Sequence, residues 1–128
     1  MRNAIKYILV IIVLPLIYLN CKYIFNPYKI EPVTINNVAA KQTFTFKADP
    51  QDKHVWSMHL KIMGELNGRA KIYMGYDSIK TSYSFEIPAG KINMEKHTDW
   101  YEKECILTYE LIDCTAGNLK IECEFGSD

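Results

Sequence analysis

A two-residue hydrophobic period runs through this chain from Gln42 onward and restricts its fold more than any other feature. Apolar and polar side chains alternate in segments 43–48, 54–62, 70–74, 80–87, 91–95, 105–111 and 119–125. Successive side chains of a β-strand point to opposite faces, so each segment predicts a strand with one buried face. No βαβ pattern is present. We therefore predict an all-β fold over residues 42–128, a small antiparallel β-sandwich of about seven strands, with a small barrel as the alternative.

Turn geometry predicts how two pairs of these strands connect. A two-residue loop after Leu66 would set Ile62 opposite Tyr73 and mix apolar with polar faces. A three-residue loop sets Ile62 opposite Ile72 and gives its last residue, a glycine, the left-handed position of a bulged turn. The same reasoning applies to the glycine-ended loop at residues 115–117. We therefore predict two β-hairpins, and we expect the polar stretch 95–103 to be a loop.

The first 25 residues predict export and attachment to a membrane. Arg2 and Lys6 precede thirteen uncharged residues, 7–19, as in a signal sequence. Thirteen residues are short for a helix that crosses the hydrocarbon, which needs about 20. The apolar run lengthens to residues 4–25 if Lys6 and Lys22 reach toward headgroups. We expect one N-terminal hydrophobic helix here, at the cell membrane, with the C-terminal domain on the extracytoplasmic side.

Three modes of attachment remain open for residues 1–25. We favour an uncleaved signal anchor, because a cleaved signal peptide lacks a small-x-small site after Leu19. A lipoprotein signal is the third mode, since Cys21 directly follows the apolar run. Tyr18 and Asn20, however, stand where a lipidation motif usually has leucine and a small residue. Cys21 is therefore the candidate lipidation site on which the choice depends.

Residues 26–41 are expected to form a tether. Pro27 and Pro32 interrupt any helix, although residues 33–35 could still add an edge strand. After the first 26 residues, which hold three of the 15 basic residues and no acidic one, 12 basic and 15 acidic residues remain. A nucleic-acid partner would need a clustered basic face, so this balance argues against one.

The domain contains three cysteines at nine-residue intervals, Cys105, Cys114 and Cys123. An exported protein can oxidise one pair, and Cys105 and Cys123 fall on the same face of their strands. Under the hairpin register they lie about two residue pairs apart, which strains a disulfide. Two buried free thiols are the favoured interpretation, with a Cys105–Cys123 disulfide as the alternative. Cys114, at a turn, is expected to be the most exposed thiol.

The histidines offer little catalytic or metal-binding chemistry. His54 and His59 are five residues apart on a strand and therefore point to opposite faces. His59 could meet His97 and Asp99 across a loop and bind zinc, but scattered surface histidines are far more common. No phosphate-binding glycine loop or hydrolase serine motif is present. We predict no catalytic, cofactor or metal site.

Two aromatic residues in the expected loop, Trp100 and Tyr101, are the best indication of a binding surface. Exposed aromatic rings stack on sugars or anchor protein partners. The alternative is that Trp100 folds back and closes one end of the sandwich. Trp56, by contrast, alternates with Met58 and Leu60 and is predicted to lie in the core.

The C-terminal thirty residues resemble those of small exported or membrane-anchored bacterial β-domain proteins of unknown function. The resemblance rests on Asp99-Trp100-Tyr101, Cys105, Tyr109, Gly117-Asn-Leu-Lys-Ile121 and Phe125. It implies a β-domain and an envelope location, and it offers no functional residues. Taken together, the sequence predicts a membrane-anchored, envelope-exposed and non-enzymatic interaction or binding module with a protein or glycan partner. An enzyme with an unrecognised active site and a purely structural envelope component are the alternatives.

Overall fold

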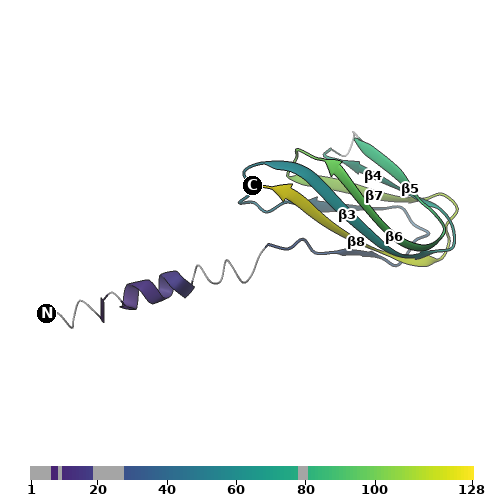
Figure 1. Cartoon of the computed structure of the whole chain (residues 1–128). Helices are drawn as coiled ribbons and strands as arrows, with labels where there is room; N and C mark the ends of the chain where they lie inside the picture. The colour runs from purple at the N-terminus through teal and green to yellow at the C-terminus, as the bar shows by residue number, and fades with distance from the viewer. Residues whose placement is uncertain (1–6, 9, 19–27, 78–80) are drawn as a thin grey trace.

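Two antiparallel four-stranded sheets face each other in the computed structural model, which describes residues 7–8, 10–18, 28–77 and 81–128 (Figure 1). One sheet has the strand order β1-β8-β3-β6 and the other β2-β7-β4-β5. The strands are β1 (Val33–Ile35), β2 (Gln42–Lys47), β3 (Val55–Leu66), β4 (Ala70–Gly75), β5 (Tyr83–Ile87), β6 (Gly90–Asp99), β7 (Glu104–Leu111) and β8 (Gly117–Ser127). The chain is thus the all-β sandwich that the alternation predicts, with eight strands in its described part.

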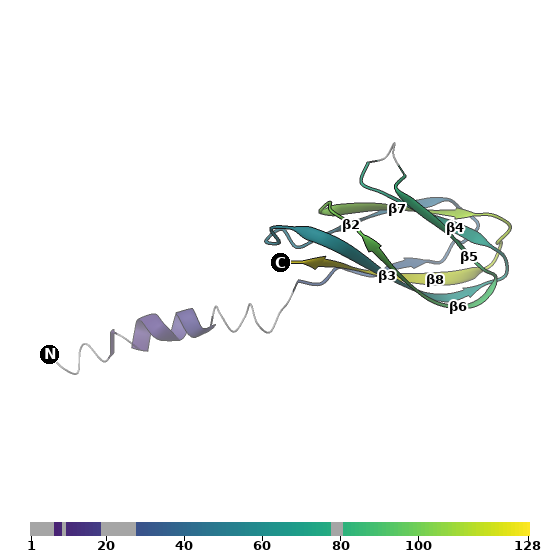
Figure 2. The ribbon, with the colours of Figure 1, turned by 45° about the horizontal axis from the view of Figure 1, so that its top comes forward.

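Figure 2 shows the two sheets as separate layers, and the side chains on their inward faces form one apolar core. Leu60 and Ile62 of β3 and Ile72 of β4 are buried there, as their alternation predicts. Ile35 and Val38 are buried as well, so the sandwich begins within the segment expected as a tether. The Tyr109 hydroxyl donates a hydrogen bond of 2.7 Å to the Val38 carbonyl, and this bond fixes the β1–β2 connection to β7.

The two predicted hairpins do not form, because β3 and β4 lie in different sheets and so do β7 and β8. Instead β3 pairs with β8, with Ile62 opposite Ile121, and β4 pairs with β7, with Ile72 opposite Tyr109. Each short connection is therefore an arch that crosses the core edge from one sheet to the other. A hairpin and an arch both leave the apolar side chains of their strands on one shared side. The alternation of apolar and polar side chains therefore fits a hairpin and an arch equally well and cannot distinguish them.

Hydrogen bonds tie the two arches together at the end of the sandwich opposite the C-terminus. The Asn67 side-chain oxygen accepts hydrogen bonds from the backbone N–H groups of Thr115 and Ala116 at 2.9 and 3.0 Å. The Arg69 guanidinium donates two hydrogen bonds, of 3.2 and 3.1 Å, to one carboxylate oxygen of Asp113. The Arg69 carbonyl in turn accepts from the N–H of Asp113 at 3.2 Å. We call these contacts between residues 67–69 and 112–116 the arch clasp.

Two glycines allow β3 and β8 to remain paired up to the arches. Gly64 and Gly117 have φ angles of +147° and +135°, where other residues are strained. A Cβ atom on Gly64 would overlap the carbonyl oxygen of Asn118, and one on Gly117 would overlap that of Glu65. The pairing therefore requires glycine at both positions.

Strand β6 is longer than the sequence predicts, because residues 95–99 are strand rather than loop. Its inward positions turn polar after Met94, and Lys96 occupies one of them with its ammonium 5.1 Å from the centre of the Phe85 ring. A cation over an aromatic face replaces an apolar contact at this sheet edge. Inward charges of this kind also protect edge strands from further pairing.

The N-terminal residues 7–8 and 10–18 are helical (Figure 1). Within the described residues, no helix has the length and apolar character needed to cross a membrane. The expectation of lipidation concerns Cys21, which lies outside the described residues, as do residues 1–6, 9 and 19–27.

Replacing Asn67 with alanine tests the arch clasp. Asn67→Ala leaves the backbone N–H groups of Thr115 and Ala116 without their side-chain acceptor. We expect the free energy of unfolding to fall by about 1–2 kcal/mol in urea titrations. Asn93→Ala is the matched control, because Asn93 is exposed on β6 and has no side-chain hydrogen bond to any described residue. Equal losses in both variants would contradict the role of the clasp.

The arch clasp should also make the free energy of unfolding depend on pH. Hydrogen bonds from the backbone N–H and then the guanidinium of Arg69 hold the pKa of Asp113 below its usual value of 3.8. Because the pKa is lowered in the folded state, the carboxylate stabilises the fold fully above pH 3.8. This stabilisation is lost as the pH falls through the folded-state pKa. In urea titrations at several pH values, the stability difference between the unaltered protein and Asp113→Asn should shrink as the pH drops. Asp99→Asn is the control, and a difference for Asp113→Asn that stays constant with pH would contradict the assignment.

Candidate functional site

Segment 28–32 opens a groove at one edge of the sandwich. Strand β1 pairs with β8 over only three residue pairs, and Val33 opposite Ile121 is the last before the segments separate. Pro32, which comes next, has no N–H with which to continue the ladder. Farther along, the Tyr28 hydroxyl donates a hydrogen bond of 2.9 Å to the carbonyl of Lys47, at the end of β2 in the other sheet. The segment therefore diverges from β8 toward the opposite sheet.

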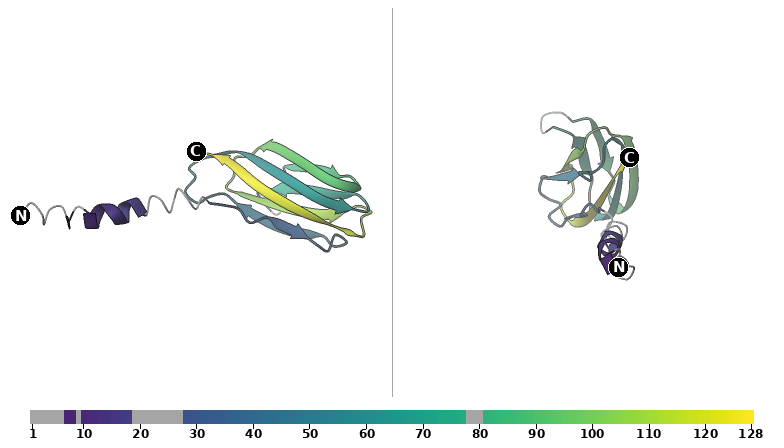
Figure 3. Two further views of the ribbon diagram at one scale, coloured as in Figure 1. Left: turned by 60° about the horizontal axis from the view of Figure 1, so that its bottom comes forward. Right: turned by 90° about the vertical axis from the view of Figure 1, so that its left-hand side faces the viewer.

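The groove between this segment and β8 has a volume of about 670 Å³. In the left view of Figure 3 the blue segment runs beside the yellow strand β8. Tyr28 and Phe125 contribute aromatic rings to its walls, and Lys29 is the one basic residue among the described residues that line it. The acidic lining residues are Asp49, Asp52, Glu122 and Glu124. The groove therefore favours a ligand with positive charge.

One wall of the groove is an open strand edge. Residues 122–127 of β8 pair with β3 on one side. On the other side, no strand of the described residues pairs with β8 beyond Ile121. Six strand residues present an edge about 20 Å long, along which every second residue offers its N–H and C=O. An unpaired edge of this kind is a template for another strand.

Trp100 and Tyr101, the predicted contact pair, are separated by the structure. The Trp100 side chain is 3% exposed and Tyr101 is 74% exposed. The Trp100 indole N–H donates to the Glu104 carbonyl at 3.1 Å, and its ring lies 6.3 Å from that of Tyr83. Trp100 thus closes the end of the sandwich, so its prediction as a contact residue is wrong, and only Tyr101 remains available to a partner.

Trp56, predicted to lie in the core, is 46% exposed. The pairing of β3 with β8 shifts register between Val55 and Ser57, so Trp56 is the extra residue of a bulge. A bulge reverses the side-chain alternation, which buries Val55 and turns Trp56 outward. Alternation alone carries no signal for such a reversal.

The three domain cysteines are buried free thiols, and no disulfide joins Cys105 to Cys123. Burial raises the pKa of Cys105 to about 12. Burial first, and then the neighbouring Cys105, also raises the pKa of Cys123. Cys114 is fully buried and not exposed as predicted, because the arch that carries it folds against the core. The thiols of Cys105 and Cys123 therefore stay protonated at neutral pH and are poor nucleophiles.

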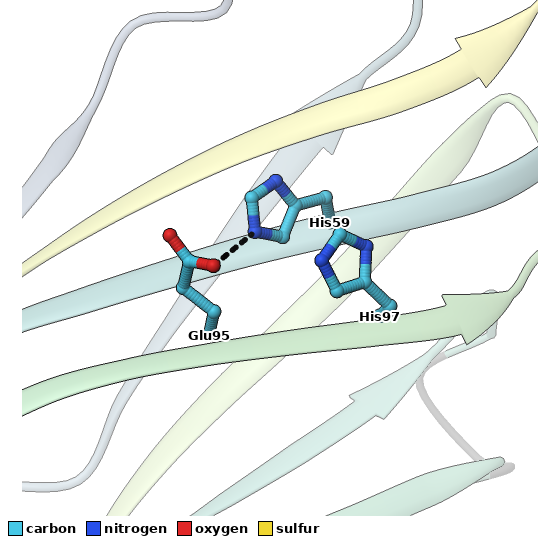
Figure 4. A group of neighbouring side chains, drawn as sticks. All are labelled: His59, Glu95 and His97. Carbon is cyan, nitrogen blue, oxygen red and sulfur yellow. Dashed lines mark ion pairs between the residues drawn. The ribbon is translucent and has the colours of Figure 1, made fainter.

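A pair of histidines lies on the outward face of the sheet β1-β8-β3-β6, on strands β3 and β6 (Figure 4). Because β6 continues to Asp99, His97 stands directly opposite His59 of β3. Their rings stack with centres 4.0 Å apart and planes 4° from parallel. Glu95, two residues before His97, completes the group, and its Oε2 lies 3.7 Å from His59 Nε2. The sequence suggested Asp99 as the third member, and Glu95 takes that place.

No family model matches this chain, and no curated protein matches it. Among solved structures, it is similar to the pre-peptidase C-terminal domain of collagenase from Bacillus anthracis, at 9% identity and a TM-score of 0.56, over 75% of this chain and 90% of that one. It also matches CsCBM6-3 from Clostridium stercorarium in complex with cellobiose, at 11% identity and a TM-score of 0.46, over 80% and 85%. At such low identity the first likeness shows the β-sandwich fold alone, and the second is too slight to support an argument.

Proposed function

We propose that this chain is a non-enzymatic interaction module, held at the cell envelope by its N-terminal segment, that binds an extended basic segment of a partner protein. The observation that carries this proposal is the open edge of β8 along a groove of about 670 Å³. An added strand would pair with residues 122–127 through its backbone. Backbone pairing supplies affinity, and the side chains around the edge supply specificity.

The groove lining determines what kind of segment fits. Of the four carboxylates among the described lining residues, Glu122 already pairs with Lys120 at 3.3 Å. Asp49, Asp52 and Glu124 remain to attract lysine or arginine side chains of the incoming strand. Tyr28 and Phe125 add aromatic surface for its apolar positions. Aromatic rings beside carboxylates also suit a sugar, which makes a glycan the second candidate. Only a peptide, however, would use the unpaired backbone of β8.

The chemistry of the groove supports binding rather than catalysis. Cys123 is the only thiol among the described lining residues, and burial keeps it protonated and poorly nucleophilic. None of the lining residues in the described part of the chain is a histidine that could act as its base. The carboxylates of Asp49 and Asp52 remain as charges that attract a ligand.

The attachment proposal rests on the charged and apolar pattern of residues 1–25. Tyr28, the first described residue after the helix, lines the groove. Ten residue steps connect Tyr28 to residue 18, the last described helical residue. The groove wall at Tyr28 is therefore close in sequence to the attached segment, and a partner bound in the groove would lie near that segment.

The binding proposal is tested with the full chain in detergent and two disordered peptides that differ only in charge, one alternating lysine with valine and one glutamate with valine. We expect the lysine peptide to bind and to slow hydrogen exchange at the amides of residues 122–127. The double variant Asp49→Lys/Asp52→Lys should weaken binding about tenfold, since each rim charge contributes about 0.5–1 kcal/mol. Glu102→Lys is the matched control, because Glu102 is exposed and does not line the groove.

Two results would overturn the peptide proposal. The first is slowed exchange along β6 or β5, at the other edge of the sandwich, with none along β8. The second is equal weakening by Glu102→Lys and by the double variant. Binding of a neutral oligosaccharide in the same groove, without slowed hydrogen exchange along β8, would identify a glycan rather than a peptide as the ligand.

The location is tested by fractionating cells that produce the full chain. We expect the protein in the membrane fraction, with the sandwich accessible to protease added outside the cytoplasmic membrane. The mass of the purified protein then identifies the attachment. An intact residue 1 indicates a signal anchor, a lipid-modified start at Cys21 a lipoprotein, and an unmodified start near Lys22 secretion. Recovery in the soluble cytoplasmic fraction would contradict the proposal.

A further inference from the structure

We propose that His59, Glu95 and His97 form a binding site for a divalent transition-metal ion, of which Zn²⁺ is the representative. From the sequence, zinc binding by His59, His97 and Asp99 was considered and set aside because scattered surface histidines are far more common. The structure brings the two histidines together with Glu95 instead of Asp99. The observations behind this inference are not those that support the groove and its partner.

The strand pairing places the three side chains together on one outward face. His59 lies opposite His97, and the neighbouring pair is Lys61 opposite Glu95. Buried Leu60 and Ile92 lie on the inward face at alternate positions of the same strands, which points the three ligand side chains outward. One potential ligand atom from each of the three lies within 4.8 Å of the others. Directly paired strand residues bring their Cβ atoms about 5 Å apart, so the closeness of the histidines follows from the register.

The geometry suits a bound ion better than a direct contact. The 3.7 Å between His59 Nε2 and Glu95 Oε2 is too long for a hydrogen bond. With bonds of about 2.1 Å to each atom, this separation corresponds to an N–metal–O angle of about 124°, and a shortening of about 0.3 Å would bring it to the tetrahedral value. His97 and Glu95 are exposed, so rotation of their side chains can bring all three ligand atoms into bonding range. The stacked rings would tilt apart to share the ion.

His59 provides a second observation that favours an ion. Its Nε2 atom is buried and has no hydrogen-bond partner among the described residues. A buried polar atom without a partner is destabilising, and native proteins rarely contain one. A metal ion bonded to Nε2 would satisfy this atom.

The charges around the cluster also favour a cation. Glu124 of β8 lies opposite His59 on the other side of β3, and it is exposed on the same outward face. Asp99 occupies the next outward position of β6 after His97. Lys61, opposite Glu95, is the nearest cation by register. Two histidines and a carboxylate therefore stand in an acidic neighbourhood, with Glu124 or water available for a fourth position.

The ligand set selects the class of metal. Imidazole nitrogens suit Zn²⁺, Cu²⁺ and Ni²⁺, whereas Ca²⁺ and Mg²⁺ prefer sites made of oxygen atoms. Two histidines with one carboxylate and an open position is a known ligand set for zinc. We therefore expect binding of Zn²⁺ and no competition from Mg²⁺.

The test is a calorimetric titration of the full chain, without a histidine tag, with Zn²⁺ in the presence of excess Mg²⁺. We expect saturable binding of one ion per chain. His97→Ala and Glu95→Gln remove exposed ligands without touching the core, and His97→Ala should weaken binding by at least about 100-fold. His54→Ala is the matched control, because His54 is exposed just before β3 and lies outside the cluster. It should bind Zn²⁺ like the unaltered chain.

A second measurement separates loss of ligands from loss of folding. Co²⁺ in place of Zn²⁺ should give the visible absorption of a tetrahedral site, and His97→Ala should abolish it while the circular dichroism of the β-sandwich stays unchanged. Absence of saturable Zn²⁺ binding below the millimolar range would overturn the proposal. So would a loss of affinity in His54→Ala as large as in His97→Ala.

Discussion

The arch clasp is the contact on which the strand order of this protein depends. By holding residues 67–69 against 112–116, it sets two arches side by side, and each strand entering one arch pairs with a strand leaving the other. β3 thereby pairs with β8 instead of β4, and the far side of β3 becomes free for β6. The pairing of His59 with His97 follows from that placement. So does the open edge of β8, whose outer neighbour β1 is only three residues long.

The sequence predicts which residues are buried far better than which strands pair. Alternation identifies Leu60, Ile62 and Ile72 as core positions, and all three are buried. Pairing depends instead on whether a short connection turns within one sheet or crosses to the other. The glycine-ended loops suit both, and the deciding contact joins Asn67 to Thr115 across 48 residues. No local pattern reveals a contact of that range.

The sequence did not predict the groove, and it suggested Asp99 where Glu95 stands in the histidine cluster, for related reasons. β6 was expected to end near Glu95 because its inward positions become polar, but an edge strand tolerates an inward lysine that covers the Phe85 ring. A usable signal was the continued outward spacing of Glu95, His97 and Asp99 at every second residue. The groove had one local signal as well: Pro32, directly before β1, prevents the strand from beginning earlier in the chain. Its other wall depends on the long-range hydrogen bond of Tyr28 to Lys47.

The groove and the histidine cluster meet at one residue. Glu124 lines the groove and is also the cross-strand neighbour of His59. A cation held by His59 and Glu95 would therefore offset negative charge at the edge of the groove, and its attraction for a basic segment would weaken. If Glu124 became the fourth ligand, its carboxylate would leave the groove altogether. Two sites that are separate in chemistry would then compete for one side chain, because β8 lies between them in the sheet.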